Sequence, residues 1–311
     1  MGGTLSRSAW LVLVAIGAVN LALPSRGAEA TIVFASNRSG SMDVYVMDPD
    51  GENARNVSRN VAWDWYPTWS PGGEEIAFSS QRGGDGEIYA MGLIDGRARR
   101  LTRRAGLDIA PSWSPDGRRI AYEHWDGTSK DVSTMDTDGA NPRQLADGAW
   151  AASPAWSMAG SRIAYSARDA IYAVGPREGD PVRIIGERGF DLAWSPDDRR
   201  IAYSLFDNGN WDICVMDVDG GAERRLTRHG GLDYDPAWSP DGAAIAFTSE
   251  RDGGSDIFIV DVDGRDNPRN ITRSGTLDGQ PAWARPGASL WAAAAGVVPT
   301  TWGWLRRVGV H

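Results

Sequence analysis

Four aspartates occur at one fixed place in this sequence, each five residues before a tryptophan. Two further tryptophans of the same series have Ala151 and Gly189 at that place instead. Carboxylates gathered around one opening would focus a negative field, which could hold a cation such as calcium or a basic peptide. The alternative is that each aspartate caps its own turn. The four candidate binding residues are Asp64, Asp108, Asp233 and Asp278.

The tryptophans mark a repeat that occurs six times. A typical copy reads Pro111-Ser112-Trp113-Ser114-Pro115-Asp116-Gly117, and in the first five copies an isoleucine follows seven residues after the tryptophan. The steps between successive tryptophans are 44, 43, 38, 44 and 45 residues. A period of this length with several short strands per copy is typical of propeller blades. The tryptophans are Trp69, Trp113, Trp156, Trp194, Trp238 and Trp283.

Each copy divides into four expected strands. The Pro-x-Trp-Ser segment is the first, the Ile-Ala-Phe/Tyr segment is the second, and Pro-Asp-Gly makes the tight turn between them. An apolar third strand such as 256–260 and a short outer strand such as 270–272 follow. The third strand is apolar on successive residues, which indicates a sheet covered on both faces by its neighbours. The sequence therefore predicts an all-β fold, a six-bladed β-propeller.

The two ends of the repeat array are incomplete in complementary ways. Segments 31–34, 43–47 and 56–58 supply strands two to four of a blade before the first tryptophan of the series. A lone first strand surrounds Trp283 near the other end. We expect this C-terminal strand to complete the first blade, because closing the ring in this way removes the exposed edges that an open array would present.

Residues 1–30 have the three-part form of a cleavable secretion signal. Arg7 is followed by an apolar run over 9–23 and then by Ala28-Glu29-Ala30. The run is shorter than the roughly 20 residues that a spanning helix needs. We expect cleavage after Ala30, a secreted or periplasmic protein and no membrane span in its mature form. The propeller is then expected at 31–286, and residues 287–311 form a C-terminal tail to which the sequence assigns no role.

The repeat also resembles that of a known family. Pro-x-Trp-Ser-Pro-Asp-Gly, Ile-Ala-Phe, a Met-Asp-x-Asp-Gly turn and Leu-Thr resemble, in this order, the repeat of the TolB-type six-bladed propellers over about residues 31–286. The resemblance implies a secreted or periplasmic propeller that binds a protein or peptide partner in the cell envelope. TolB carries an additional α/β domain ahead of its propeller. Here the first strand directly follows the signal, so that domain is expected to be lacking.

Composition excludes several kinds of site. A formal net charge of −9 argues against a nucleic-acid-binding protein, which needs a basic face. The single cysteine, Cys214, excludes a disulfide framework and a cysteine-based zinc site, and its apolar context predicts a buried strand residue. His124 and His229 fall in predicted loops without catalytic partners. Asp-x-Asp-Gly segments such as 136–139 echo a calcium loop, but no bidentate Glu follows, so hairpin turns are favoured.

These observations favour a monomeric binding module without catalysis. The sequence contains no nucleophile elbow, and it predicts no catalytic residue, metal site or obligatory cofactor. The repeated serines after each tryptophan are interpreted as turn residues. The alternative is a propeller enzyme that acts on carbohydrate or peptide substrates at the channel mouth, because 41 acidic residues allow many carboxylate pairs.

Overall fold

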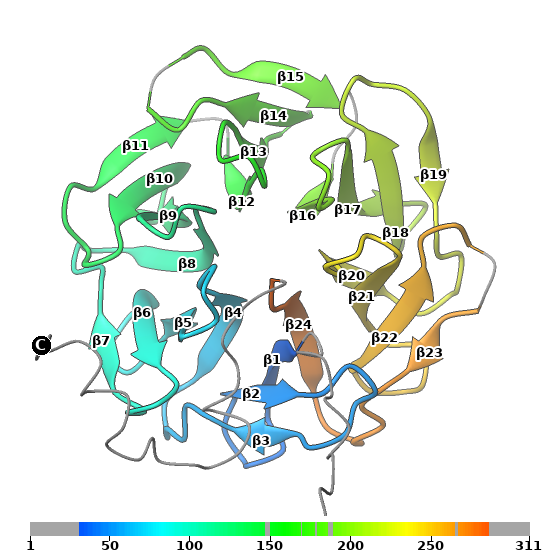
Figure 1. Ribbon diagram of the computed structural model, residues 1–311, viewed down its shortest axis with the longest axis horizontal. Helices are drawn as coiled ribbons and strands as arrows, with labels where there is room; N and C mark the ends of the chain where they lie inside the picture. Colours follow the sequence, from blue (N-terminus) through cyan, green and yellow to red (C-terminus); the bar gives the residue numbers. More distant parts are fainter. Residues whose placement is uncertain are drawn as a thin grey trace, which may run out of the picture.

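The protein is a ring of six four-stranded antiparallel sheets around a central channel (Figure 1). The computed structural model describes residues 31–146, 150–168, 170–177, 179–185, 189–264 and 267–285. This architecture confirms the predicted all-β six-bladed propeller. The predicted signal and the predicted tail 287–311 lie outside the described residues. Within the described ranges, we find no helix with the length and apolar character needed to cross a bilayer.

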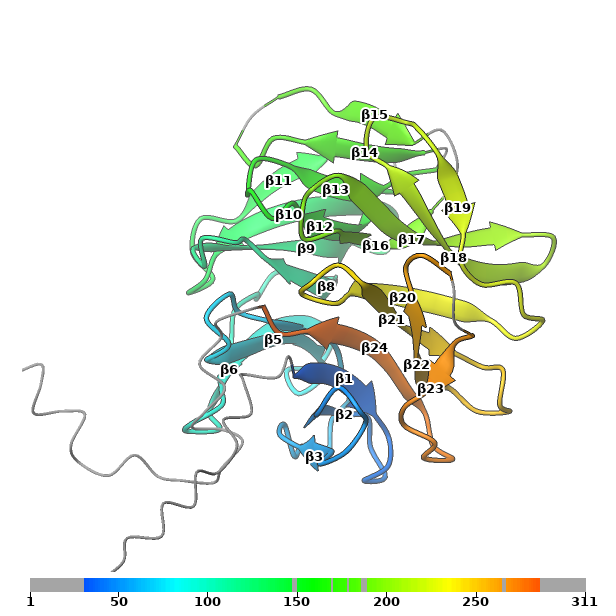
Figure 2. The same ribbon diagram turned by 45° about the vertical axis from the view of Figure 1, so that its right-hand side comes forward.

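Each blade has four strands, which follow one another outward from the channel (Figures 1 and 2). Blade 1 contains β24 (Asp278–Trp283), β1 (Ile32–Ser36), β2 (Asp43–Met47) and β3 (Arg55–Asn56). Blade 2 contains β4 (Asp64–Trp69), β5 (Glu75–Ser80), β6 (Glu87–Gly92) and β7 (Ala98–Arg100). Blade 3 contains β8 (Leu107–Trp113), β9 (Arg119–Trp125), β10 (Lys130–Asp136) and β11 (Arg143–Ala146). Blade 4 contains β12 (Ala152–Trp156), β13 (Ile163–Ser166), β14 (Ile171–Val174) and β15 (Val182–Ile185). Blade 5 contains β16 (Phe190–Trp194), β17 (Arg200–Asp207), β18 (Asn210–Asp217) and β19 (Glu223–Arg225). Blade 6 contains β20 (Asp233–Trp238), β21 (Ala244–Ser249), β22 (Asp256–Asp261) and β23 (Arg269–Asn270).

The turns between strands follow the sequence motifs. In blade 3 the Ser114 hydroxyl donates to the Asp116 carboxylate at 2.6 Å and accepts the backbone N–H of Arg119 at 2.9 Å. Gly117 completes this turn with a φ of 69°, which a residue without a Cβ adopts at no steric cost. The Asp136–Gly139 segment likewise closes a tight turn through a 2.9 Å backbone hydrogen bond. The interpretation of the repeated serines and of the Asp-x-Asp-Gly segments as turn residues is therefore confirmed.

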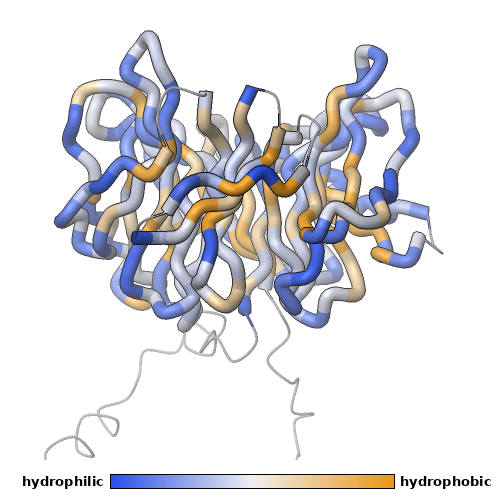
Figure 3. Tube along the Cα trace, turned by 90° about the horizontal axis from the view of Figure 1, so that it is seen from above, coloured by the Kyte–Doolittle hydropathy of each residue, from blue (hydrophilic) through white to orange (hydrophobic). Residues whose placement is uncertain are grey.

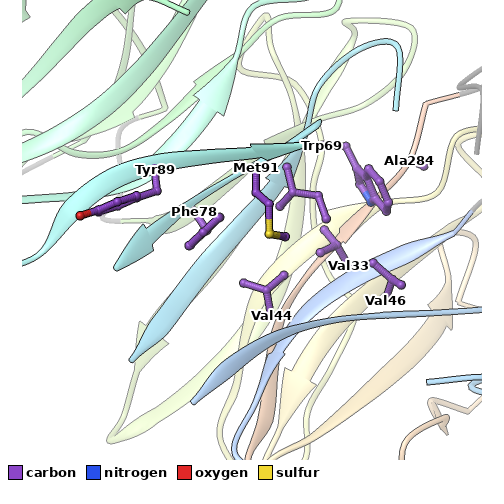
Figure 4. Close-up of a cluster of buried hydrophobic side chains, with 9 residues drawn as sticks. Val33, Val44, Val46, Trp69, Phe78, Tyr89, Met91 and Ala284 are labelled. Carbon is purple, nitrogen blue, oxygen red and sulfur yellow. The ribbon is translucent and has the colours of Figure 1, made fainter. Parts of the chain in front are cut away.

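Apolar side chains fill the space between neighbouring blades. Trp69 of blade 2 packs in one cluster with Val33, Val46 and Ala284 of blade 1 (Figure 4). The indole N–H of Trp238 also donates to the Ala193 carbonyl of the preceding blade at 3.1 Å. In side view, hydrophobic residues occupy the strands inside the ring, and hydrophilic residues predominate at its rims (Figure 3). Burial between blades thus provides the core of the protein.

The ring closes where the sequence predicts. β24 pairs with β1 in an antiparallel register that places Ile32 opposite Trp283 and Ser36 opposite Asp278. The backbone N–H of Ala284 adds a 2.8 Å bond to the Thr31 carbonyl. The first blade is therefore built from both ends of the repeat array, and the predicted closure by a C-terminal strand is confirmed.

The direction of the innermost strand distinguishes two faces of the ring. The turn face lies at the tryptophan ends of these strands and carries the Pro-Asp-Gly and Asp-x-Asp-Gly turns. The loop face lies at the opposite ends. It carries the loops between the second and third strands of each blade, such as 37–42 and 81–86, and the loops that lead to the next blade, such as 57–63 and 226–232.

Replacing Trp283 tests the importance of the closing strand. Trp→Ala at buried sites costs about 3–5 kcal/mol, so Trp283→Ala, at a partly buried position, should lower the unfolding free energy by about 2–3 kcal/mol. Ile94→Ala is the matched control, because Ile94 is 68% exposed in a turn. Urea unfolding followed by tryptophan fluorescence measures both. Equal midpoints for the two variants would show that the closing strand is not a major source of stability.

Candidate functional site

The four aspartates predicted to ring the channel mouth lie at the loop face, at or next to the first residue of their strands. Their side chains are fully buried, and each is held by a basic side chain. Arg82 binds Asp64 with an N–O distance of 2.5 Å, and Arg38 binds Asp278 at 2.7 Å. Each of these arginines comes from the loop after the second strand of the same blade. We call this arrangement the Asp–Arg clamp.

The clamp of blade 6 shows its construction most fully. Arg251 Nη2 donates to both carboxylate oxygens of Asp233, at 3.0 and 2.8 Å. Ser249 Oγ donates to the same carboxylate at 2.6 Å and accepts Arg251 Nε at 2.9 Å. The guanidinium also lies over the rings of Phe247 and Phe258, at 5.5 and 4.9 Å. The arginine thus neutralises a buried carboxylate while its flat faces cover aromatic rings.

Blade 3 builds the clamp differently and corrects one prediction. His124 was expected in a loop without a partner, but it is a buried residue of β9, because the hairpin of β9 and β10 extends to Trp125. Its Nδ1 lies 2.6 Å from Asp108 Oδ1, and Arg104 from the preceding loop adds a contact at 3.3 Å. The histidine occupies the place that a serine holds in blades 1, 2 and 6.

These contacts show what the aspartates do inside their own blades. Burial raises the pKa of Asp64 above its ordinary value, while hydrogen bonds from Ser80 and the charge of Arg82 oppose that rise. The partners are arginine, serine and histidine side chains, rather than the backbone amides that a turn-capping aspartate would bind. Their binding of a cation or a basic peptide stays a prediction.

A different set of six residues surrounds the channel. Each lies three residues before a blade tryptophan and has a positive φ between 50° and 56°. At this point the pairing with the second strand shifts register, so a bulge turns the residue inward. The six residues are Tyr66, Ala110, Ser153, Asp191, Asp235 and Gln280.

The bulges join each blade to the one before it. The backbone N–H of Tyr66 donates to Gln280 Oε1 at 2.8 Å. The N–H of Gln280 donates to Thr248 Oγ1 at 2.9 Å and also to the Asp235 carboxylate, whereas the N–H of Asp235 donates to the Asp191 carboxylate. The polar side chains of the channel therefore satisfy main-chain donors that the bulges expose.

Two of these carboxyl groups lie side by side. Burial and the neighbouring Asp191 carboxylate raise the pKa of Asp235 well above its ordinary value. Burial also raises the pKa of Asp191, and Glu123 contributes to that rise. Burial, together with these three carboxylates, raises the pKa of Tyr66 well above its usual value. The ionised forms of these carboxyl groups are therefore disfavoured, because they are poorly solvated and lie close to one another.

The channel widens into a cavity of about 260 Å³, lined by these residues and by the prolines and tryptophans beside them. The sequence did not single out Asp191 or Asp235, because their position differs in type from copy to copy. Glu123 also faces the cavity and is paired with Lys130 at 2.5 Å. Among the described residues, no cluster of three or more Asp, Glu, His or Cys has a metal-binding arrangement. A small polar ligand is what this cavity could accommodate.

Comparison with protein families matches the chain to the TolB beta propeller domain at residues 18–174 and 185–296. The chain belongs to this family. A curated relative, the Tol-Pal system protein TolB of Thioalkalivibrio sulfidiphilus, is 45% identical to it over 40 residues. That stretch covers 13% of this chain and only 9% of the relative. Local identity is therefore confined to about the length of one repeat.

Solved structures share the TolB propeller fold. TolB from Acinetobacter baumannii superposes with a TM-score of 0.75 at 23% identity, over 82% of this chain and 67% of that chain. Oligogalacturonate lyase from Vibrio parahaemolyticus superposes with a TM-score of 0.54 at 12% identity, over 74% and 86%. At such identities the likeness shows the fold alone, and this fold supports enzymes as well as other proteins.

The clamp of blade 6 gives a stability prediction for the TolB propeller. Asp233→Asn should lower the unfolding free energy by about 3 kcal/mol, because it leaves the charge of Arg251 without its partner in a mostly buried place. Thermal unfolding at neutral pH measures the effect. A melting temperature equal to that of the wild type would mean that the clamp adds nothing.

Asp235→Asn, two residues away, should have the opposite effect. The raised native pKa of Asp235 means that this carboxyl favours the folded state only when protonated, and that contribution is lost as the pH rises through its native pKa. Asparagine keeps the acceptor for Gln280 without the charge. The melting temperature should therefore rise at pH 7.5, by roughly 2–4 °C for each kcal/mol gained, and the gain should shrink towards pH 4. A gain that is independent of pH would refute the electrostatic cause.

Proposed function

We propose that this TolB propeller is a secreted or periplasmic binding module that engages a protein or peptide partner of the cell envelope and catalyses no reaction. It acts as a monomer that presents its loop face to the partner. The proposal combines the surface of the ring, the state of its channel and the family to which the chain belongs.

The distribution of exposed apolar side chains carries the proposal. Eight large apolar side chains of the described residues are exposed, and six of them lie at the loop face. The other two, Ile94 and Val182, lie in a turn and on an outer strand. Exposed aromatic side chains on one face of a protein are typical of a protein interface. The six are Val61, Trp63, Trp125, Trp150, Phe206 and Leu277.

The channel offers less support for catalysis. The carboxylates of Asp191 and Asp235 accept main-chain hydrogen bonds, and Glu123 is ion-paired. Ser153 lies beside Glu123 in the described cavity lining, and it donates its backbone N–H to that carboxylate at 3.4 Å. The matched relative from Thioalkalivibrio is named as a member of the Tol-Pal system, which favours an envelope partner.

Site-specific photo-crosslinking tests the proposal. A benzophenone amino acid placed at Trp63 or at Phe206 of the mature protein should yield a crosslinked protein in envelope extract. The same group at Ile94 is the control, because that residue is equally exposed but lies on the turn face. Crosslinking of the same partner from Ile94, or crosslinking from none of the three positions, would contradict binding through the loop face.

A further inference from the structure

The six blades are copies of one repeat. Where two neighbouring blades have a different residue from the other four at the same repeat position, that part of the ring has a role of its own. Blades 1, 2, 3 and 6 contain the Asp–Arg clamp. Blades 4 and 5 lack its carboxylate, because Ala151 and Gly189 occupy the aspartate position. Blade 5 also lacks the arginine: Asp207 stands where blade 2 has Arg82, six residues after the isoleucine of the second strand, and Phe206 directly precedes it.

Aromatic side chains gather at the loop-face end of blade 5. The Phe206 ring lies 5.1 Å from that of Trp211, and Phe190 meets Trp211 edge-on at 5.4 Å. Phe206 is 54% exposed at the loop face. Phe190 and Trp211 form a partly buried support beneath it, which holds an apolar ring at the surface.

Blade 4 departs in a related way. Its Arg168 follows the isoleucine of the second strand by five residues, one position earlier than the clamp arginines do, and the guanidinium lies 5.4 Å from the centre of the Trp150 ring. Trp150 is itself exposed. We use the name blade 4–5 sector for Trp150, Arg168, Phe190, Phe206, Trp211 and Arg228.

Basic groups border this apolar surface. Arg228 and His229 are exposed in the loop after β19, which Asn210 beside Trp211 fixes through a 2.7 Å bond to the His229 carbonyl. Asp207, next to Phe206, is paired with Arg225 at 3.0 Å. The side chain of Asp207 is thus held by a basic partner, which Asp212 shares.

The charge of the whole face agrees with this local pattern. The position of Arg228 carries an exposed arginine in three other blades, namely Arg59, Arg103 and Arg273. The exposed acidic residues of the Asp-x-Asp-Gly turns, such as Asp138 and Asp219, lie on the opposite face. The loop face therefore presents exposed arginines together with exposed aromatic rings, beside acidic loop residues such as Asp85 and Glu250.

We infer that the blade 4–5 sector docks an acidic peptide segment of the partner, one that carries an aromatic or leucine side chain as its apolar anchor. This inference rests on the proposed function and names the chemistry of its ligand. The anchor packs on Phe206 and Trp150, and carboxylates of the segment meet Arg168 and Arg228. Arginine and aromatic side chains are the residues that most often dominate such interfaces.

Three synthetic peptides test the inference by fluorescence anisotropy with the full mature protein. The first, of about 12 residues, places one Phe and one Leu among Asp, Glu, Gly and Ser, a length that suits docking of one segment. The second replaces every acid by Lys, and the third replaces Phe and Leu by Ala. We expect the first to bind at least about tenfold more tightly than the others, more weakly as salt is raised.

Single substitutions test whether the first peptide binds at the blade 4–5 sector. Phe206→Ser and Arg228→Glu should each weaken binding of the first peptide at least about tenfold. Ile94→Ser is the control and should leave it unchanged, since Ile94 is exposed on the other face. Both altered side chains are exposed, and matching melting temperatures would verify that the variants are folded.

The possible outcomes separate the two proposals. Preference for the basic peptide, binding of none of the three up to about 1 mM, or an equal effect of Ile94→Ser would overturn the inference. If the acidic peptide fails while crosslinking from Phe206 still yields an envelope partner, the ligand chemistry is wrong and the binding function stands. If acidic peptide binds at this sector but no envelope protein is crosslinked, the inferred chemistry stands and the envelope partner is wrong.

Discussion

Sheets that are apolar on both faces can be stable in water only when another sheet covers each face. β2 is buried at all of its five residues and β6 at five of six, so a single blade could not exist alone. A row of such blades would leave two outer faces exposed, whereas in a closed ring every face is covered by a neighbouring blade and only the short inner and outer edges of each sheet remain. The pairing of β24 with β1 is therefore the contact on which the packing of all six blades depends.

Polar side chains around this closed core satisfy two kinds of buried group, a carboxylate at the loop face and a backbone N–H in the channel. At the loop face, a carboxylate buried at the end of an inner strand requires a cation, and an arginine of the same blade supplies it in three of the four clamps. In the channel, a bulge directs an N–H away from its own sheet, and a side chain of the preceding blade accepts it. Residues that look functional by their charge thus maintain the ring, which leaves the exposed rim as the surface available for binding.

The sequence predicted those features that repeat in all copies. The tryptophan period predicted the blades, and the incomplete first blade predicted the closure. Cys214 is a buried residue of β18, as its apolar surroundings suggested. These predictions succeeded because they depend on residue types that every copy must contain in order to pack.

Features that differ between copies were harder to predict. The bond between Arg38 and Asp278 joins residues 240 positions apart, so no local pattern reveals it. Asp191 and Asp235 were missed because their position holds six residues of five types around the ring. The available signal was a variable residue directly before the Pro-x-Trp segment, which has Leu192 in place of proline in blade 5. The bulge that gives this residue its inward direction is not visible in the sequence. His124 was misplaced because the length of the β9–β10 hairpin exceeds that of its counterpart in most other copies.

The shared first blade also determines how the molecule responds to force. Ala284 and Thr31 are joined by a hydrogen bond at the very end of the β24–β1 pair, where the described chain both begins and finishes. Tension applied to these two ends would load that bond first and then the next, so the seam would unzip one rung at a time. The two ends lie side by side, so tension between them pulls the two antiparallel strands apart at one end, and their hydrogen bonds are loaded in sequence and not all together. The pairing that completes the ring is thus also the first contact to be loaded by tension between its two ends.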